Sequence, residues 1–193
     1  MTSAEIQTRP LDPHDAVAVE QASAVLIEAF GSESFPPSRL ADLARAPRRR
    51  VLTATLGGSI VCVGMAERLG SDLGLFATFD EAARALLARH RLGNLDSMAV
   101  APGHRMRGIG QRVAHELLAW LAEGGCDLAV ASSWVSGGPN PSLPGLQKLG
   151  FRAIAEQPGE VHRVRNLGGR PCPVCGIPCR CTGILLIRRI DPR

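Results

Sequence analysis

Aromatic side chains are scarce in this chain, because tyrosine is absent and phenylalanine and tryptophan together make up 4% of it. Flat rings on which bases could stack are therefore few, which argues against a nucleic-acid-binding surface. No uninterrupted apolar run approaches the length of a membrane span, and the first ten residues, MTSAEIQTRP, lack the apolar segment of a signal peptide. We expect a cytoplasmic protein that does not contact a membrane, and the scarcity of aromatic residues disfavours nucleic acid as a partner.

The length of 193 residues and the hydrophobic content of 45% predict a single globular domain that spans residues 1–193. The formal net charge of +4 is mild and favours anionic ligands. A run of three arginines, Arg48 to Arg50, precedes an apolar segment. We interpret it as the solvated entry to a strand, the alternative being contact with an acidic substrate or a nucleic acid.

Alternating and helical patterns predict a mixed α/β protein. Helix starts are predicted at Asp12, as an N-cap before Pro13, and at Thr78, as a capping box with Glu81. Strands are expected near 6–8, 51–56, 59–67, 97–100, 128–133, 151–155 and 184–190, and helices after residues 12, 78 and 108 and over 143–149. Gly57 and Gly58 mark a hairpin turn.

The most informative segment is Leu95 to Gln111, LDSMAVAPGHRMRGIGQ. It predicts a strand, a basic turn rich in glycine, and a helix. Such a turn offers free backbone N–H groups at the positive end of a helix dipole, where phosphate oxygens bind. Arg105 and Arg107 add positive charge, and glycines at 108 and 110 allow close approach to the backbone. The alternative is a flexible basic loop that only caps a helix.

The pattern Arg105-x-x-Gly108-x-Gly110 behind a strand resembles the acetyl-CoA motif of the GNAT acyltransferase superfamily. The order of elements from about Ala4 to Phe151, together with the final strand, is also similar to that superfamily. The resemblance implies a GNAT-like fold: a central mixed, mostly antiparallel sheet, flanked by helices and splayed between its fourth and fifth strands. Gln147 to Phe151 (QKLGF) resembles a second family sequence.

The resemblance also implies a cofactor site for acetyl-CoA. The turn would hold the pyrophosphate, and the strand backbone would bind the pantetheine arm and polarise the thioester carbonyl. Asn140 lies near a family asparagine that contacts the cofactor arm, although its spacing differs by one residue. The expected cofactor-binding residues are Met98, Ala99, Val100, Arg105, Met106, Arg107, Gly108, Ile109, Gly110, Gln111 and Asn140.

Acyl transfer to an amine needs a base, because an alkyl ammonium has a pKa of about 10 and must lose a proton before it attacks. Asp96 and Glu67, at strand ends, are the candidates, the alternative being ordinary solvated charges. Many family members use a tyrosine as the acid for the leaving thiolate, but Leu146 occupies that position here. Water or Ser142 could protonate the thiolate instead.

These features predict an N-acetyltransferase that acts by direct attack in a ternary complex. The acceptor is a small-molecule or peptide amine, and a homodimer is compatible with the sequence. The missing tyrosine keeps open a non-catalytic acyl-CoA-binding or regulatory module. A zinc-knuckle protein that contacts nucleic acid is a further alternative.

Four of the six cysteines crowd into ten residues: Cys172, Cys175, Cys179 and Cys181. A Cys-x-x-Cys step followed by glycine is typical of a metal knuckle, and four thiolates leave no open coordination position. We therefore expect a structural zinc ion in an insertion over residues 170–182, before the last strand. An iron–sulfur cluster, two disulfides and a redox switch are the alternatives.

Overall fold

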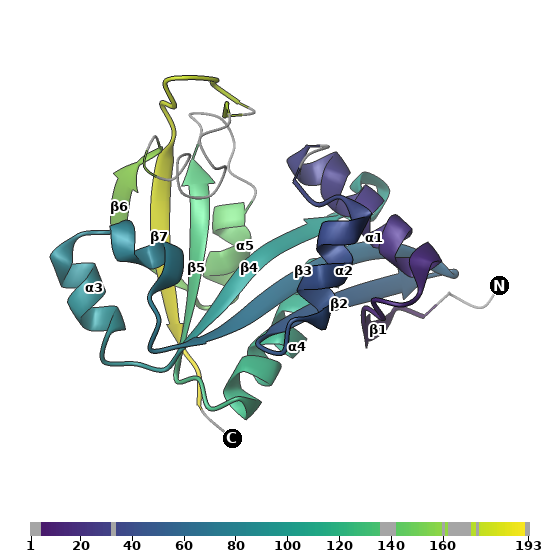
Figure 1. Cartoon of the computed structure of the whole chain (residues 1–193), viewed down its shortest axis with the longest axis horizontal. Coiled ribbons are helices and arrows are strands. Elements are labelled where there is room, and N and C mark those ends of the chain that lie inside the picture. Colours follow the sequence, from purple (N-terminus) through teal and green to yellow (C-terminus); the bar gives the residue numbers. More distant parts are fainter. Residues whose placement is uncertain are drawn as a thin grey trace. The chain divides into compact units, whose positions relative to one another are not determined.

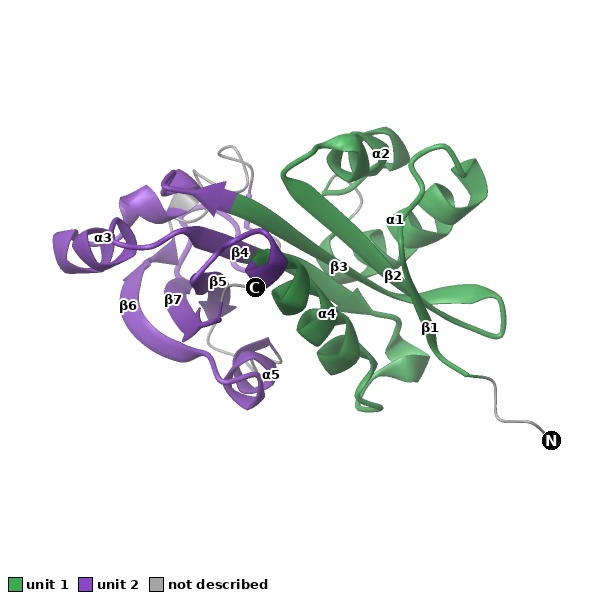
Figure 2. Ribbon diagram, turned by 90° about the horizontal axis from the view of Figure 1, so that it is seen from below, with its two compact units in different colours: residues 1–68, 95–121 green, residues 69–94, 122–193 purple. Residues whose placement is uncertain are grey.

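The computed structural model describes residues 5–31, 34–135, 142–159, 161, 171–172 and 174–191. Its contacts divide the chain into two compact units, residues 1–68 with 95–121 and residues 69–94 with 122–193 (Figure 2). The elements, labelled in Figure 1, are β1 (Gln7–Pro10), α1 (Ala16–Phe30), α2 (Pro37–Arg45), β2 (Arg49–Leu56), β3 (Ser59–Gly70), η1 (Gly74–Thr78), α3 (Glu81–Leu87), β4 (Leu92–Val100), η2 (Pro102–His104), α4 (Ile109–Glu123), β5 (Leu128–Val135), α5 (Ser142–Lys148), β6 (Arg152–Pro158) and β7 (Thr182–Arg189).

The strands are hydrogen-bonded in the order β1-β2-β3-β4-β5-β7-β6. Strands β4 and β5 are parallel, whereas the pairs β1–β2, β2–β3, β5–β7 and β6–β7 are antiparallel. The β4–β5 ladder has three residue pairs, from Leu92↔Leu128 to Asn94↔Val130. This mixed, mostly antiparallel sheet confirms the predicted fold class.

In the first unit, helices cover both faces of the strands (Figure 2). Helices α1 and α2 lie on one face and α4 lies on the other. Apolar residues recur at helical spacing on α1 and on one side of the strands beneath it. This pattern builds the buried core under α1 and α2. Its buried members are Leu11, Ala18, Val19, Ala22, Val25, Leu26, Leu40, Ala41, Val51, Ile60, Val63, Met65 and Ala99.

In the second unit, β7 lies between β5 and β6, and α3 and α5 lie on opposite faces of these strands (Figure 2). Strand β7 is apolar on both faces, with five consecutive buried residues from Gly183 to Ile187, as expected of a central strand. The core on the α3 side contains Leu69, Phe76, Phe79, Ala83, Leu87, Leu92, Leu128, Val130, Leu185 and Ile187.

Two predicted helix starts are wrong. Helix α1 is capped by Asp15, whose side chain accepts a hydrogen bond from the Ala18 N–H at 3.0 Å. Asp12 instead accepts from the His14 N–H at 2.9 Å, which closes a turn before the helix. Helix α3 is capped by Asp80, and Thr78 ends the 3-10 helix η1. In both cases a nearer aspartate satisfies the first free N–H groups of the helix.

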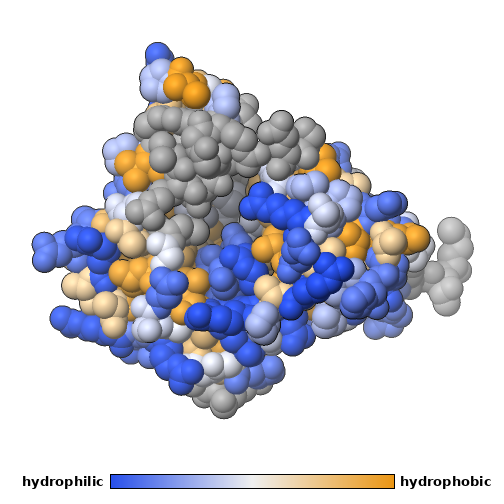
Figure 3. All heavy atoms as spheres, viewed as in Figure 1, coloured by the Kyte–Doolittle hydropathy of each residue, from blue (hydrophilic) through white to orange (hydrophobic). Residues whose placement is uncertain are grey.

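None of the helices in the described ranges has the length and apolar character needed to cross a membrane. The face drawn in Figure 3 is dominated by hydrophilic residues, and hydrophobic ones form small separate patches. One patch lies at the top of this view, on the loop that carries the cysteines. There the side chains of Val174 and Ile177 are 65% and 60% exposed.

Candidate functional site

The turn between β4 and α4 has the backbone conformation of an anion-binding concavity. After η2, Met106 and Gly108 both adopt left-handed backbone angles, with φ of 60° and 76°. Met106 is the one non-glycine residue with positive φ in the described part of the chain, and its side chain is 95% exposed. Left-handed residues interspersed in a turn direct successive N–H groups toward one point, where an anion can bind.

Most amide groups of this turn make no hydrogen bond to other described residues. The Arg112 N–H donates to the Gly108 carbonyl at 3.0 Å and begins the α4 ladder. The amide groups of residues 107–111 find no acceptor among the described residues. Arg105 and Arg107 are exposed beside them, so positive side chains, free N–H groups and the positive end of a fifteen-residue helix coincide.

Strand β4 and the start of α4 are closely packed at Gly110. A Cβ atom there would lie 3.3 Å from both Met98 Sδ and Val100 Cγ2. The Arg105 Nε donates to the Val100 carbonyl at 2.9 Å, which ties the turn to the end of the strand. By contrast, a Cβ on Gly108 would meet no atom within 4 Å, so this glycine faces open space.

Helix α4 is fixed to β3 by a second close approach. A Cβ on Gly64 would lie 2.7 Å from Val113 Cγ1 and 2.9 Å from Leu117 Cδ1, so helix and strand touch at this glycine. Further along α4, the Trp120 ring has Arg68 Cζ 3.9 Å and Arg50 Cζ 5.3 Å from its centroid. These cation–π contacts and the packing at Gly64 hold the helix that carries the turn.

Side chains at the end of β4 alternate between two environments. Met98 and Val100 lie next to Gly110, whereas Ala99 belongs to the core under α1 and α2. Asp96, earlier on the same strand, pairs with Arg49 of β2.

Arg49 brings the two predicted acidic residues together. Its Nη2 lies 2.5 Å from Glu67 Oε2, and its Nη1 lies 3.0 Å from Asp96 Oδ2. The three side chains are 24–28% exposed. Asp96 Oδ1 also accepts a hydrogen bond from Ser97 Oγ at 3.3 Å. One guanidinium between two carboxylates leaves this cluster, the Arg49 triad, with a net charge of −1.

The arginine run was interpreted from the sequence as solvated, and Arg49 was missed as a site residue. Each of the three arginines has a partner in the first unit. Arg48 Nε donates to the Arg68 carbonyl at 2.7 Å, Arg49 holds the acidic pair, and Arg50 lies over Trp120. The signal that could have found Arg49 is the strand register, in which it lies directly opposite Glu67.

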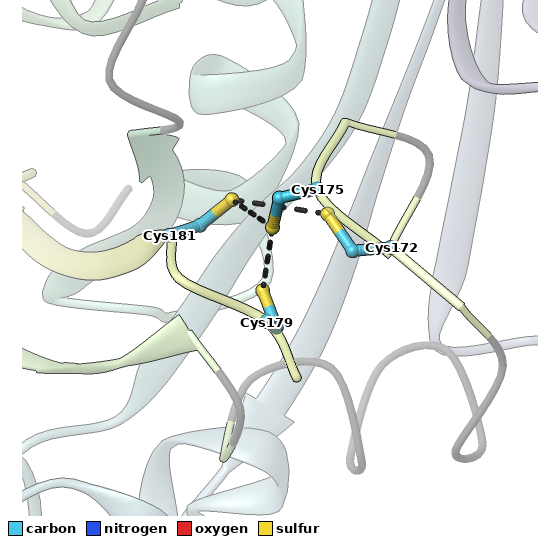
Figure 4. Close-up of side chains that lie close together, drawn as sticks. All are labelled: Cys172, Cys175, Cys179 and Cys181. Carbon is cyan, nitrogen blue, oxygen red and sulfur yellow. Dashed lines mark hydrogen bonds between the residues drawn. The ribbon is translucent and has the colours of Figure 1, made fainter. Parts of the chain in front are cut away.

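The four clustered cysteines converge in the second unit, as Figure 4 shows. Their sulfur atoms all lie within 4.8 Å of one another. Cys175 Sγ is 3.5 Å from Cys181 Sγ and 3.7 Å from Cys179 Sγ, and Cys172 Sγ is 3.8 Å from Cys181 Sγ. All six cysteines of the chain are free thiols, and Cys62 and Cys126 are buried elsewhere.

The environment of each thiol shifts its acidity. The Arg180 N–H donates to the Cys175 sulfur at 3.2 Å, and this bond lowers the pKa of Cys175 to about 7. Burial raises the pKa of Cys179 and of Cys181. Burial also raises the pKa of Cys62 to about 12, so this thiol stays protonated and is inert as a nucleophile.

The remaining predicted residues lie where the sequence placed them. Met98, Ala99 and Val100 end β4, Arg105 to Gly108 form the turn, and Ile109, Gly110 and Gln111 begin α4. Asn140 lies outside the described residues.

Comparison with known proteins identifies the family. The model of the acetyltransferase (GNAT) family matches residues 19–151, about two thirds of the sequence. The chain therefore belongs to the GNAT acetyltransferase family. No curated protein matches the chain significantly in sequence.

Solved structures share the fold at low sequence identity. A GNAT-family acetyltransferase structure from Desulfovibrio desulfuricans has a TM-score of 0.64 at 16% identity, covering 96% of this chain and 99% of that one. An aminoglycoside 6'-N-acetyltransferase complexed with coenzyme A gives 0.67 at 14% identity, with coverages of 97% and 98%. The ribosomal-protein-S18-alanine N-acetyltransferase from Escherichia coli gives 0.64 at 14% identity, with coverages of 98% and 96%.

Proposed function

We propose that the protein transfers an acetyl group from acetyl-CoA to an amine by direct attack in a ternary complex. The observation that carries this proposal is the β4–α4 turn. Its amide groups at 107–111 have no acceptor within the described part of the chain, its residues 106 and 108 are left-handed, and two exposed arginines flank it. Membership of the GNAT family and the likeness to a structure complexed with coenzyme A favour acetyl-CoA as the donor.

In this proposal the turn binds the pyrophosphate of the donor through residues Arg105 to Gln111. The backbone of Met98 to Val100, at the end of β4, bonds the pantetheine arm and donates an N–H to the thioester carbonyl. An N–H fixed beside that oxygen stabilises the negative charge that develops there during attack. Gly110 favours this arrangement because its lack of a side chain lets the start of α4 lie close to Met98 and Val100.

The proposed base is Asp96 or Glu67, acting on the amine directly or through water. One guanidinium, that of Arg49, contacts both carboxylates. Each carboxylate has one oxygen paired with the arginine. The negative charge that remains on the Arg49 triad favours a cationic amine over a neutral acceptor. We propose a small-molecule or peptide amine as the acceptor.

The second candidate function is a non-catalytic acyl-CoA-binding or regulatory module. The observation that favours it is the absence of tyrosine from the sequence, since Leu146 occupies the position of the acid found in many family members. A thiol has a pKa of about 8.5, so a thiolate leaves without strong acid assistance. Because the thiolate can leave without a tyrosine, catalysis remains our first proposal.

Calorimetric titration with acetyl-CoA tests the site through Gly108→Asp. A carboxylate about 6 Å from a phosphate charge costs about 3 kcal/mol at an effective dielectric constant of about 20, which corresponds to roughly 100-fold weaker binding. Gly58→Asp is the matched control, because Gly58 also has positive φ (+84°) and open space but lies in the β2–β3 turn. Equal affinity of the two variants would contradict the site.

Release of free thiol in the presence of a broad panel of primary amines then separates the two functions. The enzyme requires thiol release with at least one amine, and at sub-saturating acetyl-CoA this release must be strongly reduced in Gly108→Asp. Tight binding of acetyl-CoA with no release for any amine would establish the binding module instead.

The proposed cofactors are acetyl-CoA as co-substrate and a zinc ion in a structural role. The thiolates of Cys172, Cys175, Cys179 and Cys181 would hold the zinc. Four sulfur atoms within 4.8 Å of one another surround space for one ion and match the preference of zinc for tetrahedral thiolate sites.

A further inference from the structure

The sulfur–sulfur distances are compatible with four ligands of one ion. Zinc–sulfur bonds of about 2.3 Å in a regular tetrahedron place neighbouring sulfur atoms about 3.8 Å apart. The three recorded separations are 3.5, 3.7 and 3.8 Å. A disulfide would need sulfur atoms about 2.05 Å apart, and a multi-iron cluster would push the four sulfur atoms beyond 4.8 Å to make room for bridging sulfides. The arrangement fits a single ion.

Two backbone N–H groups direct the thiolates. The Val174 N–H lies 3.4 Å from Cys172 Sγ, and the Arg180 N–H lies 3.2 Å from Cys175 Sγ. Between them, Gly176 turns the chain at φ 70° and exchanges two backbone hydrogen bonds with Cys172, at 2.9 and 3.2 Å. Bonds of this kind fix ligand direction and support a metal from outside its coordination shell.

The cluster is joined to the ends of three strands. Cys181 directly precedes Thr182, which is paired with Val135 of β5 on one side and with Pro158 of β6 on the other. The Gly159 N–H, just after β6, donates to the Cys181 carbonyl at 2.6 Å. The side chain of Trp134, near the end of β5, packs against the cysteines.

Gly159 is the tightest of these junctions. A Cβ atom at this position would lie 2.3 Å from the Cys181 carbonyl oxygen and 2.6 Å from its carbonyl carbon. Both atoms belong to backbone, so they cannot move aside as a side chain would. Any other residue at 159 forces a shift at the junction between Gly159 and Cys181, one of the four cysteines.

We infer that the metal site is a clasp, one zinc ion on Cys172, Cys175, Cys179 and Cys181, that orders the adjoining ends of β5, β6 and β7. The inference rests on the zinc of the proposed function but is independent of acetyl-CoA and of the acceptor. Gly159 and Trp134 are its positioning residues. Four thiolates leave no open position, so the ion has no role in acyl transfer.

Metal analysis of the whole protein, prepared under reducing conditions, tests the ligands. We expect about one zinc per chain, and tetrahedral tetrathiolate absorption after exchange with Co²⁺. Cys175→Ser should lose most of the metal, whereas Cys62→Ala, which removes a buried thiol outside the clasp, should retain it. Iron in place of zinc, or equal metal content in the two variants, would overturn the assignment.

A second experiment tests the clasp itself. Removal of zinc by a chelator should speed amide hydrogen exchange at residues 182–185 and at the end of β6, and added zinc should restore protection. Gly159→Ala keeps all four ligands and should weaken zinc binding in a chelator competition by roughly 10- to 100-fold. The clasp would be refuted if amide exchange rates were the same with and without zinc, or if Gly159→Ala bound zinc as tightly as the unaltered protein. Acetyl-CoA titration reports separately on the proposed function.

Discussion

Replacing Arg49 by methionine tests the Arg49 triad without knowledge of the acceptor. The guanidinium makes contacts of 2.5 Å to Glu67 and 3.0 Å to Asp96, and methionine keeps an unbranched stem while removing the charge. Exposed ion pairs contribute about 0.2–1 kcal/mol each, and side chains that are about three quarters buried lie at the upper end of that range. The substituted protein should therefore unfold with about 1–2 kcal/mol less free energy.

A double-mutant cycle with Glu67→Gln isolates the interaction. Urea unfolding of the four proteins should give a coupling free energy of about 1 kcal/mol between Arg49 and Glu67. Salt should reduce this coupling, because the screening length falls to about 3 Å in ~1 M NaCl. Arg45→Met is the matched control, since the Arg45–Asp42 pair has a similar distance of 2.9 Å but side chains that are 49% and 77% exposed.

The result that would refute the reasoning is a coupling below about 0.2 kcal/mol, equal to that of the exposed control pair. The carboxylates would then not be held by Arg49 in solution. The proposed positioning of Asp96 and Glu67 for proton transfer would lose its structural basis.

Three further substitutions have definite expected outcomes. Gly64→Ala should destabilise the protein by about 1–3 kcal/mol in urea unfolding, because Val113 and Leu117 are fully buried and cannot yield, whereas Gly103→Ala, which faces open space, should not. Asp80→Ala should cost about 1 kcal/mol by removing the N-cap of α3, and a stability equal to wild type would contradict that cap. Burial raises the pKa of Cys62 from 9.0 to about 12. The free energy of unfolding should therefore be constant below pH 9 and should fall between pH 9 and pH 12 by about 1.4 kcal/mol per pH unit. Cys62→Ala should remove that pH dependence, and parallel curves would contradict it.

The features predicted correctly from sequence are local. The β4–α4 turn is continuous in sequence, so the residues that determine its shape are adjacent and their types can be interpreted directly. The four cysteines lie within ten residues, and short spacing alone brings their sulfur atoms within reach of one ion. The fold class followed in the same way from the order of elements.

Arg49 illustrates what sequence could not supply. Counting back from the turn at Gly57 and Gly58 would place Arg48 opposite Glu67. A β-bulge between Ala54 and Thr55 shifts the register by one residue and places Arg49 there instead. A shift of one residue exchanges the two faces of a strand, so the partner of Glu67 depends on a bulge with no distinctive local sequence.

The common partner of Asp96 and Glu67 was not predicted either. The sequence marked both carboxylates as candidate bases but gave them no shared contact. Arg49 lies 47 residues from Asp96 and 18 residues from Glu67. Only the pairing of strands that are far apart in sequence reveals the cluster.

The placement of β7 determines the order in which the protein is completed. Strand β7 follows β5 and β6 in the chain yet lies between them, so these two strands have no common partner until residues 182–189 leave the ribosome. The first unit is drawn from residues 1–68 and 95–121, so all of it is synthesised before β5, β6 and β7. The second unit must await its central strand, and until then it exposes two unpaired strand edges to aggregation.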